Sequence, residues 1–95
     1  MITRIVKLNF QSGKVSEFLE IFNQNNQLLA KSDGCTSLEI FKCTSDSHTY
    51  FTISTWSSEV HLERYRQSEF FREIWSKVKP LFTNKAEAWT LNNVN

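Results

Sequence analysis

The stretch STWSSEVHLERYRQSEFF, residues 54–71, carries most of the information about how this chain folds. It completes the run TYFTISTW, which is rich in β-branched and aromatic residues and predicts a strand that ends at Trp56. Either Ser57 or Ser58 can then cap a short helix, because a serine side chain accepts a hydrogen bond from an unpaired N–H of the first helical turn. Ser68 can cap a second, longer helix in the same way. The stretch therefore predicts a strand followed by a helical region in two pieces.

Strand and helix patterns also alternate toward the N-terminus. Residues 2–10 have the period of two that is typical of a strand, and the even-numbered positions, Arg4 and Leu8 among them, form the better core face. Apolar residues at helical spacing then follow a candidate N-cap at Ser12. Gly34 lies just past the last turn and marks the end of this helix. This part of the chain therefore predicts a strand and then a helix.

The remaining segments complete the order of elements. Residues 35–43 and 49–56 are β-rich runs joined by a polar linker, which predicts two antiparallel strands. Pro80 is expected at or past the end of the longer helix, and residues 85–94 form a weaker last strand. The order βαββαβ predicts an α+β fold of the ferredoxin-like type, a four-stranded antiparallel sheet with the helices on one face. We expect a single domain over residues 1–95, because the chain is too short for a second core.

The face of the sheet that the helices leave bare carries aromatic side chains. We expect this face to include Ile5, Ser37, Phe41, Tyr50 and Trp89. A monomer would expose these side chains to water, whereas a two-fold axis allows one patch to cover the same patch on a second copy. The sequence therefore predicts a homodimer that closes sheet to sheet into a shared α/β barrel.

Composition and charge narrow the classes of partner. The chain has 11 Lys and Arg against 10 Asp and Glu, and no run of like charges, so neither nucleic acid nor an anionic membrane is expected as a partner. It shows no signal peptide and no apolar run of membrane-spanning length, so we expect a cytoplasmic protein. Cys35 and Cys43 lie in one predicted strand, too far apart for a disulfide, and neither has a histidine close in sequence that would indicate a metal site.

Three motifs give the chain a resemblance to a known family. They are FQSGKVSEFLEIF at the entry to the first helix, the Gly34–Cys35 turn, and TWSSEVHLERYRQSEFF. In their order and spacing the chain resembles the antibiotic biosynthesis monooxygenase domain of the dimeric α/β-barrel superfamily, from Ile2 to about Leu91. Trp56, Ser68 and Phe71 fit the family pattern, and Tyr65 occupies a position where histidine is common. The resemblance implies a small homodimer that oxidises a phenolic or quinol compound without metal or flavin.

A related branch of the superfamily degrades haem, and this chain departs from it. That branch uses an asparagine on the first strand, with a tryptophan and a histidine on the second helical region. The corresponding positions here are Val6, Tyr65 and Trp75, and none of them matches. Haem is therefore not expected, and we predict that the protein uses no cofactor.

Oxygenation without a cofactor requires an apolar slot for an aromatic ring, a group that shares the phenolic proton, and donors for developing negative charge. We expect the slot between sheet and helices, with a wall formed by Leu8, Phe22, Leu38, Phe51, Ile53, Trp56, Phe71 and Trp75. Tyr65 is the candidate catalytic residue, because its hydroxyl can orient a phenol by hydrogen bonding although it is a weak base. The alternative is that Tyr65 is a packed ring without a chemical role. His48 and His61 are expected at the surface.

Three functions are compatible with these features. The first is a cofactor-independent monooxygenase-like enzyme that acts on a small phenolic, quinol or polyketide-like aromatic. The second is a non-catalytic dimeric module that binds or senses an apolar small molecule, which the scarcity of bases in the slot favours. The third is a structural domain whose slot is filled by its own side chains, since the chain has 8 Phe. An open cavity beside Tyr65 would favour the enzyme.

Overall fold

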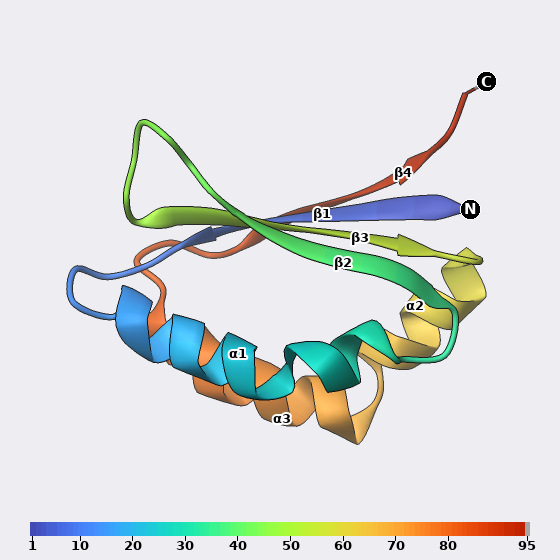
Figure 1. Ribbon diagram of the computed structural model, residues 1–95, viewed down its shortest axis with the longest axis horizontal. Coiled ribbons are helices and arrows are strands. Elements are labelled where there is room, and N and C mark those ends of the chain that lie inside the picture. Colours follow the sequence, from blue (N-terminus) through green and yellow to red (C-terminus); the bar gives the residue numbers. More distant parts are fainter. Residues whose placement is uncertain (95) are drawn as a thin grey trace.

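The computed structural model describes residues 1–94 and forms one four-stranded sheet with all its helices on the same face (Figure 1). The elements are β1 (Ile2–Asn9), α1 (Val15–Ala30), β2 (Cys35–Lys42), β3 (Thr49–Trp56), α2 (Glu59–Arg66), α3 (Glu69–Val78), the 3-10 turn η1 (Lys79–Leu81) and β4 (Glu87–Asn92). The strand order is β2-β3-β1-β4, and every neighbouring pair is antiparallel. The ferredoxin-like prediction is confirmed.

The helical region after β3 consists of two pieces because serine side chains start each one. The side chain of Ser58 accepts a hydrogen bond from the backbone N–H of His61, at 3.3 Å. Ser68 does the same for the N–H of Phe71, at 3.1 Å. Of the two serines that could cap α2, Ser58 is therefore the cap. Pro80 lies in η1, directly after α3, as expected.

The first helix begins later than the sequence indicated. Its N-cap position is Lys14, and no side chain caps it, so the predicted cap at Ser12 is wrong. The reason is the loop before it, in which Gly13 has φ +83° and the N–H of Lys14 bonds to the carbonyl of Gln11, at 3.0 Å. A residue in the left-handed region cannot continue a helix, so α1 starts only after Gly13.

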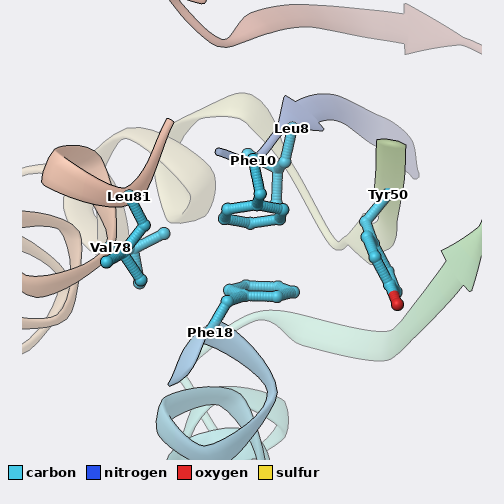
Figure 2. Packing of buried hydrophobic residues seen from close by; sticks show 6 residues of the cluster. All are labelled: Leu8, Phe10, Phe18, Tyr50, Val78 and Leu81. Atoms are coloured by element: carbon cyan, nitrogen blue, oxygen red, sulfur yellow. The ribbon is translucent and has the colours of Figure 1, made fainter. Parts of the chain in front are cut away.

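The side of the sheet that faces the helices holds the main core. The pairs Val6 with Thr52 and Leu8 with Tyr50 place all four side chains on this side. Figure 2 shows Phe10 and Phe18 stacked at its centre, with ring centroids 4.3 Å apart. The remaining side chains drawn around them are Leu8, Tyr50, Val78 and Leu81. Tyr50 is only 7% exposed, so its predicted place on the bare face is wrong.

The opposite side of the sheet carries the alternate residues. Ile5 pairs with Ile53 and with Trp89, and Phe41 pairs with Phe51. Phe51 and Ile53 therefore lie away from the helices, and their prediction as part of the pocket wall is wrong. β3 has apolar residues at both its odd-numbered and its even-numbered positions, so apolarity alone does not show which side faces the helices.

This bare side remains exposed in the single chain. Phe41 is 46% exposed and Trp89 is 43% exposed, which are high values for such large apolar side chains. The expected position of both residues on this face is confirmed by the register of β2 and β4.

Both cysteines are free thiols. Over residues 1–94, none of the helices combines the length and apolarity needed to cross a membrane.

Candidate functional site

A cavity of about 330 Å³ lies between the sheet and the helices. Its volume is within the range of small-molecule binding sites. Ala86 and Ala88 form the wall on the side of the edge strand β4. Because Ala88 lines the cavity and is also exposed, the cavity opens to solvent along β4. The third interpretation of the sequence, a domain whose slot is filled by its own rings, is therefore not favoured.

Most of the residues expected at the slot do line this cavity. They are Leu8, Phe22, Leu38, Trp56, Tyr65, Phe71 and Trp75. Phe51 and Ile53 do not, because they point from the other side of the sheet. That the wall contacts a substrate, and that Tyr65 is catalytic, stay predictions.

Aromatic rings form a continuous wall at the α2 end of the cavity. The ring of Tyr65 packs between Trp56 and Phe71, with centroid distances of 4.9 and 5.0 Å. Phe71 in turn stacks on Trp75 at 5.8 Å. The indole N–H of Trp56 donates to the Ser54 hydroxyl at 2.9 Å, which fixes the orientation of the indole. These contacts hold the Tyr65 ring in one position beside the cavity.

The hydroxyl of Tyr65 is the polar group that this wall presents. It makes no hydrogen bond to any residue among positions 1–94. Within the same range no fully buried polar side-chain atom lacks a partner, so this hydroxyl opens onto space that water or a ligand can enter. Burial raises the pKa of Tyr65, and the negative charge that the nearby Cys35 carries once it is ionised raises it further. The hydroxyl therefore stays protonated at neutral pH and can donate a hydrogen bond, but cannot act as a base.

Sequence reasoning missed the guanidinium of Arg4. Arg4 lies on the helix-facing side of β1, lines the cavity, and donates from Nη1 to the Thr90 hydroxyl at 2.8 Å. Burial lowers its pKa, as does the nearby Arg66, while Glu63 acts in the opposite direction. The sequence does contain an indication of this role, because Arg4 is a charged residue on the strand face that is predicted to face the core.

Cys35 also reaches the cavity, because β2 has an irregularity in its register between Cys35 and Ser37. Its thiol donates to the Ser37 carbonyl at 3.4 Å. Burial raises the pKa of Cys35, which keeps it a thiol and not a thiolate. Cys35 therefore contributes a neutral, weakly polar surface beside Tyr65.

The two histidines lie outside the cavity, as expected. His61 Nδ1 is 2.8 Å from the Ser58 hydroxyl, and its Nε2 is 4.0 Å from a carboxylate oxygen of Asp33. His48 lies 3.8 Å from Asp46 in the loop between β2 and β3. Across residues 1–94 there is no group of three or more His, Cys, Asp or Glu side chains that could hold a metal ion.

Comparison with known proteins supports the same fold and points to one family. The family model for antibiotic biosynthesis monooxygenase matches residues 1–76. A crystal structure described as an antibiotic biosynthesis monooxygenase superimposes with a TM-score of 0.92 at 13% identity, covering 100% of both chains. A conserved protein from Methanosarcina mazei gives 0.88 at 20% identity, with coverage of 96% of this chain and 91% of that one. A Mycobacterium tuberculosis protein gives 0.90 at 15% identity, with coverage of 99% and 95%. No curated protein sequence matches the chain.

Proposed function

The chain belongs to the antibiotic biosynthesis monooxygenase family, and we propose that it oxidises a small phenolic, quinol or polyketide-like aromatic with O₂ and without a cofactor. The main support is the cavity: it is open, mostly apolar, and presents the unpaired hydroxyl of Tyr65 at one end. An aromatic ring can enter it, and its phenolic oxygen can meet a hydrogen-bond donor there. The proposal takes residues 1–95 as one domain.

In a monooxygenation of this type the substrate loses two hydrogens and gains one oxygen atom. The second oxygen atom leaves as water, so the substrate itself supplies the electrons that reduce O₂. An ionised phenol is much richer in electrons than a neutral one, so a site that favours the phenolate favours the first electron transfer. Stabilisation of that negative charge in a dry cavity is the contribution expected from the protein.

Each part of the wall has a role in this scheme. The rings of Phe71 and Trp75 contact the substrate ring and exclude water, and Trp56 packs against Tyr65 and holds it in place. The Tyr65 hydroxyl donates to the substrate oxygen as it becomes negative. No carboxylate or imidazole lines the cavity within the described chain, so the phenolic proton leaves to water at the opening along β4.

A homodimer is the second part of the proposal. Its support is the apolar side of the sheet, where Phe41 and Trp89 are exposed in the single chain. A second copy related by a two-fold axis would cover both residues with the same patch. Because the cavity lies on the other side of the sheet, the dimer would stabilise the fold and would not complete the site.

The test is O₂ consumption during aerobic incubation with a panel of hydroquinones. Wild-type protein is expected to consume O₂ above the rate of autoxidation, and Tyr65→Phe to lower that rate at least ~10-fold. Tyr50→Phe is the matched control, because Tyr50 lies in the core and does not line the cavity. A wild-type rate equal to autoxidation with every hydroquinone contradicts the enzymatic proposal. Equal losses in the two variants contradict the role of Tyr65.

A further inference from the structure

The charged groups of the cavity and the Tyr65 hydroxyl gather at one end of it. Tyr65 and Arg66 come from α2, and Arg4 lies on β1 two residues from Ile2, which pairs with Trp56 under α2. The lining side chains toward the main core are apolar, among them Leu8, Phe18 and Val78. The cavity is therefore amphipathic along its length, with a polar end at α2 and an apolar end near the core.

Both charges at the polar end are positive. Of the described side chains that line the cavity, only Arg4 and Arg66 are ionised. Arg66 is exposed and already paired, with Nη1 3.2 Å from a carboxylate oxygen of Glu63. The wall thus offers an excess of positive charge that no carboxylate on the wall offsets.

Arg4 is the charged group that forms no ion pair, because Glu63 is paired with Arg66 and acts on Arg4 only at longer range. It is half-buried, its one hydrogen bond goes to the neutral hydroxyl of Thr90, and no carboxylate within residues 1–94 forms an ion pair with it. A half-buried guanidinium beside a second one is unfavourable unless an anion joins them. Arginine also presents a planar fork of donors that fits a carboxylate or another oxyanion well.

We propose that the ligand of this cavity is an aromatic compound with one oxyanion, a carboxylate or a phenolate, which binds to Arg4 while the ring lies against the apolar and aromatic wall. This inference rests on the proposed function in one respect, that the same cavity holds the substrate. Arg66 contributes a weaker, solvent-screened attraction at the mouth, because its guanidinium is exposed and shared with Glu63. Neutral aromatics of the same shape should bind less tightly.

Calorimetry with 2-naphthoate and 2-naphthamide tests the charge preference, because the two probes have nearly the same shape and only the first is an anion. Wild-type protein is expected to bind 2-naphthoate ~10-fold more tightly. Arg4→Gln should reduce this preference to about 2-fold or less and leave 2-naphthamide binding unchanged, whereas Arg66→Gln should reduce the preference only about 2-fold. Arg64→Gln is the control, because Arg64 lies on the same helix and does not line the cavity.

A second probe separates the two possible oxyanions. 4-Nitrophenol ionises near neutral pH, and its yellow phenolate is measured directly by absorbance. If the site takes a phenolate, the ionised fraction rises when wild-type protein is added at fixed pH, and does not rise with Arg4→Gln. A preference for 2-naphthoate without this rise assigns a carboxylate, and either result supports the proposal.

Equal binding of 2-naphthoate and 2-naphthamide by the wild type, together with no rise in 4-nitrophenolate, overturns the proposal. The same is true if Arg4→Gln weakens both naphthalene probes equally. Arg4→Lys is the control for misfolding, because it keeps the positive charge and should retain part of the preference for 2-naphthoate. The outcome is independent of turnover: a charge preference without O₂ consumption refutes only the enzymatic proposal, and O₂ consumption without a charge preference refutes only this one.

Discussion

Replacement of Tyr65 by phenylalanine separates the packing of its ring from the chemistry of its hydroxyl. The ring contacts with Trp56 and Phe71 involve the aromatic faces and edges, so Phe retains them. The hydroxyl makes no hydrogen bond within the described chain, so its removal leaves no partner unsatisfied. The free energy of unfolding at pH 7 should therefore change by less than ~1 kcal/mol.

The same variant should differ from the wild type in alkaline solution. A tyrosine in the unfolded chain ionises near pH ~10, and burial raises the pKa of Tyr65 in the folded protein above that value. Between the two pKa values unfolding releases a proton, so the stability that is fully present below pH ~10 falls by about 1.4 kcal/mol for each further pH unit. Tyr65→Phe has no ionisable hydroxyl at this position, so near pH ~11 it should be more stable than the wild type by about 1.4 kcal/mol.

Urea denaturation of both proteins from pH 7 to 11, followed by tryptophan fluorescence, measures this difference. Spectrophotometric titration gives an independent check, because the chain has 2 Tyr and the variant retains only Tyr50. Parallel stability curves across the whole pH range would show that the Tyr65 hydroxyl is as well solvated in the folded protein as in the unfolded chain, and would refute its burial in the apolar wall.

Three further perturbations test the turn, the sheet face and the cavity. Gly34→Ala should destabilise the protein by about 2 kcal/mol or more, because Gly34 has φ +84° and a methyl group there would collide with the ring of His61. His61→Ala in the same chain should recover part of this loss in a double-mutant cycle, and strictly additive losses would contradict the steric explanation. Trp89→Lys should convert the dimer to a monomer in sedimentation, without loss of the helical circular dichroism signal. A wild-type protein that sediments as a monomer at micromolar concentration would refute the dimer. Ala88→Leu should fill part of the cavity beside β4 and weaken 2-naphthoate binding ~10-fold with little effect on Tm, and unchanged affinity in calorimetry would show that the ligand does not reach this wall.

The sequence predicted those elements whose ends have local causes. The two-piece helical region follows from the hydroxyls of Ser58 and Ser68, which act on N–H groups three residues away. The side of β1 that faces the core follows from the alternation of its residues. The even-numbered positions, which include Leu8, are the more apolar ones, and the odd-numbered positions are more polar. No long-range information is needed for either conclusion.

The wrong predictions of pocket residues lie on β3, which carries large apolar side chains on both of its faces. β3 presents Phe51 and Ile53 to the bare side of the sheet, and its helix-facing side includes Thr52 and Ser54 next to the cavity. The rule that apolar residues face the helices therefore selects the wrong side. The register with β1 settles the orientation, and register depends on pairing across the sheet, which a single strand's pattern does not contain.

The polar end of the cavity is more consistent with selection for a ligand than for stability. A leucine in place of Arg4 would bury apolar surface and remove a half-buried charge that forms no ion pair, and both changes favour the folded state. The unpaired hydroxyl of Tyr65 is a second departure from the packing of an ordinary core. Local rules are typically broken at functional sites, and these two departures lie at the same end of one cavity, beside α2. Arg4 supplies a charge that the aromatic wall lacks, and Tyr65 supplies a donor, so together they provide what is needed to hold a negatively charged oxygen against a ring.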